Sequence, residues 1–234
     1  MIHWRGDAFI PNYIDSRPVA SNSRRWRFES WPELEPSEVE INFRLIYQGP
    51  LPSQSQSKTR AREKHEIRCA FNEQLKYLWG TDPYLTLINQ PGFFHHELNR
   101  RITERIGDNF NRSGFRFVPL VGKEFGTACA LNILFLRRDQ PGSLIEGGDL
   151  DNRIKTLLDA LRIPEGRQEI PDQQASDALL FCLLEDDRLI TDLSVTTDRL
   201  ITPLRETESE KDVHLIIHVR TILIDHTKQP SFWT

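Results

Sequence analysis

The chain is organised around one stretch of sequence, Gly147-Gly148-Asp149-Leu150-Asp151-Asn152-Arg153-Ile154-Lys155-Thr156-Leu157-Leu158-Asp159-Ala160-Leu161. Its larger apolar residues recur at i, i+3, i+4 and i+7, which is the spacing of a helix with one buried face. These residues are Ile154, Leu157, Leu158 and Leu161. The two glycines in front of the helix let the backbone turn sharply or approach another group closely. The stretch therefore predicts a tight turn that leads into an amphipathic helix.

The same helix carries a row of charged residues. Asp151, Lys155 and Asp159 are spaced by four, so they lie along one side of the helix. A solvated row of this kind stabilises a helix by only about 0.2–0.5 kcal/mol per pair. Asp149 stands off this row at the start of the helix, and helix stability does not explain it. A function at the first turn is the better explanation.

Composition sets the broad class of the protein. The chain has 234 residues, which suits one domain with elaborations, and 38% hydrophobic residues, which are enough for a core. Its net charge of −4 argues against indiscriminate binding of nucleic acid through bulk charge, although local basic patches decide that question. We find no secretion signal and no apolar run near the ~18 residues of a membrane span, so we expect a cytoplasmic protein without a membrane segment.

Hydrophobic periodicity predicts the other elements. Alternating or continuous apolar runs predict strands over 39–47, 115–121, 129–136, 178–184, 189–195 and 213–224. Helical spacing predicts helices over 61–79 and 93–110, and glycine and proline predict a connector over 80–92. The polar residues 163–178 are expected to form an inserted loop or a short helix.

A second acidic cluster, Glu185-Asp186-Asp187, follows one predicted strand and precedes another. Carboxylates brought together at the ends of two elements repel one another unless a cation neutralises them. Ligands that are all oxygen select a hard ion, Mg²⁺ or Mn²⁺, and such ions commonly serve phosphodiester hydrolysis. Lys155, one turn after Asp151, would then position water or offset phosphate charge. The alternative is a helix start with acidic capping residues and no chemistry.

Basic residues gather at the start of the helix predicted over 61–79. They are Lys58, Arg60, Arg62 and Lys64. A basic helix start after a polar loop suits phosphate binding, and a solvated helix end explains it equally well. The Trp- and Arg-rich segment 1–37 either stacks on bases or packs its aromatic rings onto the main body.

The histidines and cysteines are expected to be structural. His95 and His96 are adjacent and point about 100° apart on a helix, so they do not suit one metal ion. His214 and His218 share one face of a predicted strand, where a structural role is the commoner one. Cys69, Cys129 and Cys182 are far apart and without metal-type spacing, which favours reduced core residues.

The run Asp149-Leu150-Asp151-Asn152, then Lys155, Asp159-Ala160-Leu161 and Asp186-Asp187 before a strand, resembles the signature of the RusA-type Holliday-junction resolvases. The resemblance covers roughly 39–79 and 128–225. It implies an α/β (α+β) fold with a small mixed sheet flanked by helices, and a homodimer that nicks branched DNA with Mg²⁺. By position it implies that Asp149, Asp151 and Asp187 hold the metal and that Lys155 is the catalytic lysine. Asp186, Asp159 and Asn152 would support them.

The chain departs from the family pattern in several segments. The family often carries arginines directly before the first aspartate, where this chain has Ser143-Leu144-Ile145-Glu146-Gly147-Gly148. Contacts with DNA are therefore expected from Arg137 and Arg138 and from the basic group that begins at Lys58. The predicted organisation is an arm over 1–38, a nuclease domain over 39–226 and a tail over 227–234. Insertions are expected near 80–127 and 163–178.

The leading hypothesis is thus a Mg²⁺-dependent endodeoxyribonuclease, with Mn²⁺ as a substitute ion, that acts on DNA with branches. Two other hypotheses stay open. One is a non-catalytic module on the same scaffold that binds nucleic acid or protein. The other is a metal-dependent nuclease for RNA or linear DNA. Cleavage assays with and without divalent metal distinguish the catalytic readings from the non-catalytic one.

Overall fold

The computed structural model describes residues 40–53, 57–93, 99–138, 149–171, 178–202, 209 and 212–224, with backbone alone for residues 57–59 and 149. The chain divides into two units, Met1–Glu33 and Leu34–Thr234, and every described residue belongs to the second. The expected arm, the tail, the two glycines before Asp149 and the histidines 95 and 96 therefore lie outside the described residues.

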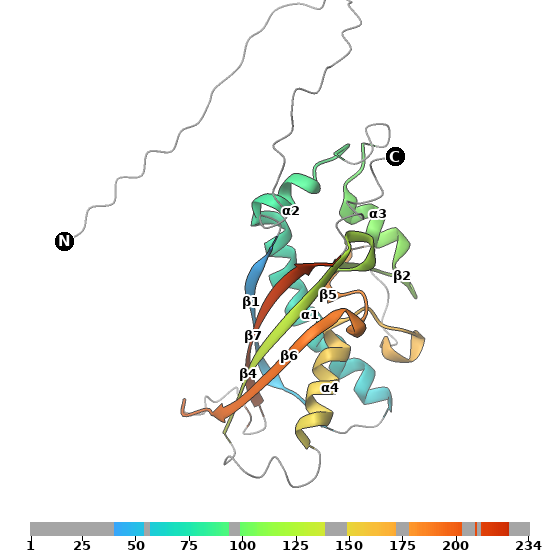
Figure 1. The fold of residues 1–234 in the computed structure, drawn as a ribbon. Coiled ribbons are helices and arrows are strands. Elements are labelled where there is room, and N and C mark those ends of the chain that lie inside the picture. Colours follow the sequence, from blue (N-terminus) through green and yellow to red (C-terminus); the bar gives the residue numbers. More distant parts are fainter. Residues whose placement is uncertain are drawn as a thin grey trace, which may run out of the picture. The chain divides into compact units, whose positions relative to one another are not determined.

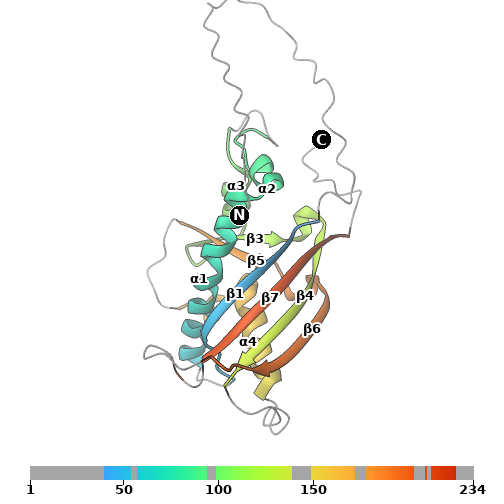
Figure 2. The ribbon, with the colours of Figure 1, turned by 90° about the vertical axis from the view of Figure 1, so that its left-hand side faces the viewer.

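A four-stranded sheet forms the larger layer of the fold (Figure 2). Its strand order is β1-β7-β4-β6. The strands are β1 (Asn42–Pro50), β4 (Thr127–Arg137), β6 (Ile190–Arg199) and β7 (Asp212–Leu223). β7 pairs antiparallel with both β1 and β4, whereas β6 pairs parallel with β4. The sheet is therefore mixed, and β1 and β6 are its edges.

A three-stranded sheet stands beside it, in the order β2-β3-β5. Its strands are β2 (Asn111–Arg112), β3 (Phe115–Val121) and β5 (Leu179–Leu184). β2 and β3 form a hairpin, and its turn contains Ser113 and Gly114, both with positive φ. β3 pairs parallel with β5, which comes from a distant part of the sequence.

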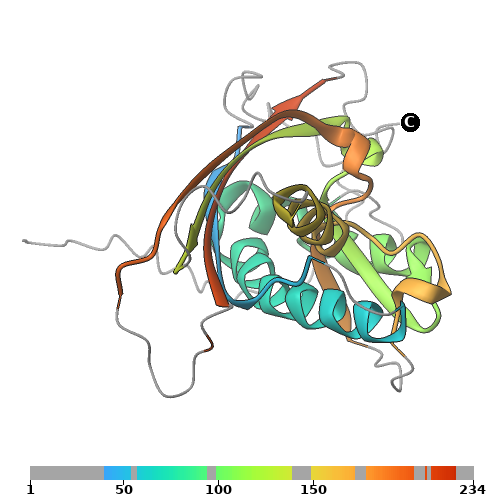
Figure 3. The same cartoon turned by 90° about the horizontal axis from the view of Figure 1, so that it is seen from below.

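Helices α1 (Ser57–Thr81) and α4 (Asp149–Leu161) lie on the concave face of the four-stranded sheet (Figure 3). Helices α2 (Pro83–Ile88) and α3 (Ile102–Asn109) follow α1 in the chain (Figure 1). Three short 3₁₀ turns complete the described elements: η2 (Lys123–Phe125), η3 (Arg167–Glu169) and η4 (Asp187–Leu189). The core lies between the sheet and these helices.

The alternation of β1 shows why it takes its place in the sheet. Leu45 and Tyr47 face the helices and are 1% and 7% exposed, whereas Arg44 and Ile46 point to the opposite face. On α4 the predicted stripe faces inward in the same way, with Leu157 fully buried. Both elements therefore bury the face that their sequence pattern predicts.

The predicted fold class, mixed α and β, is confirmed, but the chain builds two sheets where one was expected. The segment 80–127 contributes β2 and β3 to the second sheet, so it is part of the core rather than a simple insertion. The connector predicted over 80–92 contains α2, because Asp82 caps it: the Leu85 N–H donates to Asp82 Oδ1 at 2.9 Å. Pro83 stands at its first position, where proline is favoured.

Two smaller expectations are also resolved. The helix predicted over 93–110 is described only as α3, which begins at Ile102. Cys129 and Cys182 are buried as expected, whereas Cys69 is exposed on α1. Of the helices in the described part of the chain, none combines the length and apolar character that a membrane crossing requires.

Candidate active site

The first turn of α4 presents the charged residues that the sequence singles out. Asp149 begins the helix, and the side chains of Asp151 and Lys155 are exposed. Ile154 and Leu157 anchor the opposite face of the helix in the core. Asn152 is half-buried, and its carbonyl accepts a hydrogen bond from the Thr156 hydroxyl at 3.0 Å. The helix start also carries a positive partial charge, which favours carboxylates and anions there.

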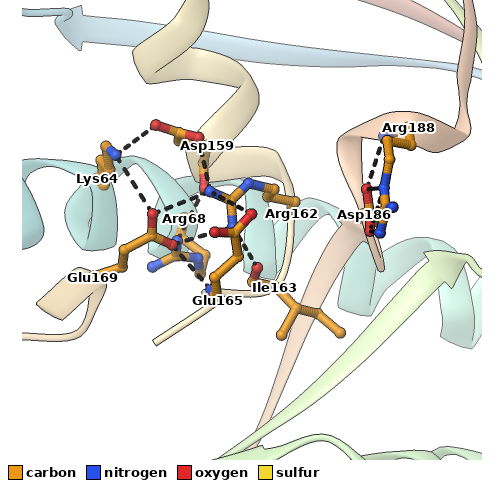
Figure 4. A network of polar contacts seen from close by, with 9 residues as sticks. All are labelled: Lys64, Arg68, Asp159, Arg162, Ile163, Glu165, Glu169, Asp186 and Arg188. Atoms are coloured by element: carbon orange, nitrogen blue, oxygen red, sulfur yellow. Dashed lines mark hydrogen bonds and ion pairs between the residues drawn. The ribbon is translucent and has the colours of Figure 1, made fainter. Parts of the chain in front are cut away.

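Asp159, two turns further along α4, faces a buried network of charged side chains (Figure 4). Its Oδ2 accepts from Lys64 Nζ at 2.5 Å, and its Oδ1 accepts from Arg162 Nη2 at 3.0 Å. The three side chains are only 13%, 8% and 6% exposed. Asp159 therefore holds α4 against α1, and its carboxylate is turned away from solvent. A substrate would approach from the solvent, so this carboxylate is not placed to contact it.

Glu169 and Arg68 extend the network. Glu169 accepts two hydrogen bonds from the Arg162 guanidinium, at 3.0 and 3.2 Å. Arg68 is 1% exposed; its Nη2 donates to the Asp159 carbonyl at 3.1 Å, and its guanidinium lies 5.9 Å from the centre of the Phe117 ring. The network thus joins α1, α4, η3 and the second sheet, which identifies it as a structural clamp.

Asp186 and Asp187 lie at the turn between β5 and β6. Asp186 caps η4: its Oδ1 accepts from the Arg188 backbone N–H at 2.9 Å, and its Oδ2 accepts from Arg188 Nη2 at 2.5 Å. These hydrogen bonds hold the pKa of the Asp186 carboxyl well below its usual range. Asp187 is the first residue of η4 and is exposed. Asp186 is therefore committed to Arg188, and Asp187 is the accessible carboxylate of the pair.

Asp149 and Asp151 belong to the first turn of α4, and Asp186 and Asp187 lie just before β6, which begins near the other end of α4 (Figure 1). Asp151 is ten residues before Leu161, the last residue of α4, which corresponds to about 15 Å along the helix axis. Just after the last residue of α4, the Ile163 N–H donates to the Leu184 carbonyl at 3.0 Å. The segment that follows Leu184, with Asp186 and Asp187, therefore starts beside this end of the helix. Mg²⁺ binds its ligands at about 2.0–2.1 Å. The described residues therefore give no arrangement in which Asp151 and Asp187 surround one ion within a single chain.

The described side chains contain no group of three or more His, Cys, Asp or Glu residues arranged to hold a metal ion. The resemblance implies Asp149, Asp151 and Asp187 as ligands of one ion. Because Asp187 belongs to the turn between β5 and β6, the described side chains do not assemble this set within a single chain. The exposed Asp151 carboxylate suits such an ion better, since Mg²⁺ is often held by one or two carboxylates plus the phosphates of its substrate. The start of α4 is thus the part of the expected site that suits a divalent ion.

The basic residues expected to contact DNA are divided between interior and surface. Lys64 is committed to Asp159, and Arg137 is 5% exposed on the side of the sheet that the helices cover. Neither can reach a phosphate outside the protein in this conformation. The interior positions of these two residues correct the expectation that all six basic residues form a surface for nucleic acid.

The remaining basic residues lie nearer the surface. Arg60 is exposed, and the Lys58 side chain lies outside the described part. Arg62 Nε pairs with Glu66 Oε1 at 2.9 Å, with both side chains largely exposed. Arg138 Nη1 donates to the Thr202 carbonyl at 3.0 Å. Arg60 and Arg62, near the start of α1, are thus better placed to bind a phosphate than Arg138, which follows β4.

Sequence reasoning missed the partners that fix the acidic residues. Arg188 follows Asp186 by two positions, and Arg162 follows Asp159 by three, so both pairs had a local signal in their spacing. The contacts of Lys64 and Arg68 with Asp159 join residues more than 90 positions apart, and spacing gives no sign of them.

Comparisons with protein-family models, with curated proteins and with solved structures find no match to this chain.

Proposed function

We propose that this protein is an endonuclease that hydrolyses phosphodiester bonds in DNA with Mg²⁺ or Mn²⁺, similar in its motif to the RusA-type Holliday-junction resolvases. The observation that carries the proposal is the first turn of α4. There Asp151 is exposed two residues after Asp149, and Lys155 is exposed one turn further on. This combination of carboxylates and an accessible lysine exceeds what a capped helix start requires.

The residues at this turn have distinct roles in the proposal. Asp149 and Asp151 would hold the divalent ion, which when bound supplies positive charge at the scissile phosphate and activates water. The positive end of α4 favours the approach of a phosphate to the same place. Lys155, on the side of the helix that carries Asp151, would donate to a phosphate oxygen or hold the attacking water. Asp187 has no role within the same chain.

The proposed substrate and the proposed oligomeric state rest on the resemblance to the RusA-type resolvases. Branched DNA, with the Holliday junction as its main form, is the proposed substrate, and a homodimer is the proposed active form. A dimer with two-fold symmetry places two identical sites on one substrate, which suits paired cuts. A cytoplasmic location is part of the same proposal.

A second candidate function is a non-catalytic module that binds nucleic acid or protein. Two observations favour it: Asp186 is engaged by Arg188, and β6, which Asp187 precedes, begins near the end of α4 that is opposite to the first turn with Asp151. A protein of this kind keeps the scaffold and has no use for a complete metal site.

Cleavage of synthetic DNA distinguishes the two functions. The full chain is incubated with four-way junction, fork, duplex and single-stranded substrates, once with Mg²⁺ and once with a chelator. We expect metal-dependent cleavage, strongest on the branched substrates. Asp151→Asn should lower the cleavage rate by about 100-fold or more, which corresponds to about 2.7 kcal/mol of transition-state stabilisation.

Asp192→Asn is the matched control, since Asp192 is exposed on β6 away from α4 and its replacement should leave the rate unchanged. Junction binding, measured by gel shift with Ca²⁺, should survive in both variants. Wild-type activity that Asp151→Asn leaves intact would refute the assignment of the site. A wild type that binds DNA and cleaves none of the substrates would support the binding module.

A further inference from the structure

β1 is an edge strand, and a side chain of α1 closes its free side at Ile46. On one side β1 pairs with β7, and on the other it faces α1 (Figure 2). The side-chain amide of Gln74 on α1 takes the place of a neighbouring strand there. It accepts from the Ile46 N–H at 2.9 Å and donates to the Ile46 carbonyl at 2.7 Å. Ile46 is therefore satisfied without a second strand.

The edge is open on the N-terminal side of Ile46. Backbone groups of an antiparallel strand alternate between its two neighbours, so Arg44 and Asn42 turn theirs to the same side as Ile46. Ile41 confirms the alternation, since its N–H and carbonyl both bond Thr221 of β7, at 2.8 and 3.1 Å. Among the described residues none bonds the outward N–H and carbonyl of Asn42 and Arg44. Such a row of free groups is a template for another strand.

A groove of about 430 Å³ runs beside this open edge, between β1 and α1. Phe43 and Leu45 form its wall on the strand, and Tyr77 and Leu78 form its wall on the helix. The Tyr77 side chain is 73% exposed, which is unusual for a large ring beside other apolar groups. An extended chain that pairs with Arg44 would turn its alternate side chains into this groove.

We propose that the open edge of β1 pairs antiparallel with β1 of a second copy of this chain, about a two-fold axis at Asn42. In this register Asn42 lies opposite the partner's Asn42, and Glu40 lies opposite the partner's Arg44. The two-fold axis repeats the pair, so Arg44 meets the partner's Glu40. The four-stranded sheet of each copy then continues into that of the other.

Charge and shape select this register. Opposite charges directly across a strand pair stabilise it, and like charges destabilise it, so a register that pairs Arg44 with the partner's Arg44 is disfavoured. On the face toward the helices, Phe43 lies opposite the partner's Ile41 at the mouth of the groove. A ring beside a β-branched residue is a favourable cross-strand pair. Gln74 limits the ladder, because it already occupies Ile46.

This inference supplies an interface for the homodimer of the proposed function, and its test measures assembly instead of cleavage. A failure of one is thus distinguishable from a failure of the other. The ladder over residues 40–44 is short, and interfaces of this size are weak. We expect dissociation in the micromolar range, on the order of 1–100 μM.

The test uses two charge reversals in the full chain, Arg44→Glu and Glu40→Arg, studied by sedimentation velocity between about 1 and 200 μM. Each variant alone places two like-charge pairs across the two-fold axis, and its dimer should dissociate about tenfold more readily. Glu40→Arg also removes the exposed ion pair between Glu40 and Arg220 of the same chain, at 3.7 Å, which Arg44→Glu leaves intact. A mixture of the two variants restores both opposite-charge pairs in the mixed dimer. The mixture should therefore dimerise as wild type does, although neither component does so alone.

Arg199→Glu, on the exposed opposite edge of the sheet, is the matched control and should dimerise as wild type does. Thermal unfolding of each variant confirms that the single reversals stay folded, and recovery in the mixture shows the same. A wild type that is monomeric throughout would overturn the proposal. So would a dimer that either reversal leaves intact, or a mixture that stays monomeric. Binding of an unrelated extended peptide at this edge by a monomeric wild type would assign the edge to another partner.

Discussion

Asp159 illustrates how one residue's role depends on contacts that its own neighbourhood does not contain. Its spacing from Asp151 and Lys155 predicts a place in an exposed row, but its carboxylate faces Lys64 of α1 and Arg162. The helical period is 3.6 residues, so positions four apart drift around the helix, and the third member of the row turns toward α1. Asp151 and Lys155, at the free end, stay exposed as expected.

Replacement of this carboxylate tests the structural role. Asp159→Asn removes one of the two carboxylates that neutralise the buried cations Lys64 and Arg162, and it leaves Glu169 in place. Because Asp159 accepts charge-assisted hydrogen bonds from both cations, we expect a loss of about 1.5–3 kcal/mol in the free energy of unfolding, measured by urea titration.

Glu66→Gln is the control for this prediction. This variant breaks the ion pair between Arg62 and Glu66, whose side chains are 71% and 57% exposed. The free energy of unfolding should fall by less than about 1 kcal/mol. Equal losses for the two variants would show that the Asp159 network contributes no more than a surface pair.

At the scale of elements, the sequence predicts what is periodic and misses what is paired at a distance. β3 is predicted over 115–121 and occupies Phe115–Val121, and the stripe of α4 is buried as its spacing indicates. The second sheet was not predicted, because β3 joins β5 across about 60 residues, and no local pattern records which strands become neighbours. The same limit applies to the candidate site. The sequence shows both acidic clusters, but it does not show how far apart the fold places them.

The Gln74 amide is a contact between elements that can be measured directly. Gln74→Ala removes both hydrogen bonds to Ile46 and leaves that part of the β1 edge open to water. Since a hydrogen bond contributes about 0.5–1.5 kcal/mol net, we expect a loss of about 1–2 kcal/mol in the free energy of unfolding. The Ile46 amide should also exchange its hydrogen faster, as seen by NMR.

Lys76→Ala separates this effect from a change in helix propensity. Lys76 is exposed on the same helix, and its replacement should leave both the stability and the Ile46 exchange rate nearly unchanged. An Ile46 amide that remains protected in Gln74→Ala would mean that β1 has another partner at this position, and it would contradict the assignment of Gln74 as the closing group.

At the scale of the whole described fold, α1 is the element that both sheets share. It packs on β1 of the larger sheet, and it faces β5 and β3 of the smaller one. The clamp around Arg68 and Asp159 lies where α1, α4 and η3 meet, so the two sheets depend on α1 for their common core. A change in the stability of this junction should therefore be felt by the entire fold.

His65 on α1 makes that junction sensitive to pH. Its ring is 6% exposed and lies 5.3 Å from the Phe115 ring of β3, and burial, followed by the nearby Arg68 charge, lowers its pKa. The unfolded chain binds a proton at His65 near pH 6.5, whereas the folded chain resists it. Because the unfolded state then holds more protons, stability falls as the pH drops below about 6.5. Urea titrations at pH 7.5, 6.5 and 5.5 should show this loss, and His65→Gln should flatten it. Retention of the full slope in His65→Gln would place the pH sensitivity elsewhere.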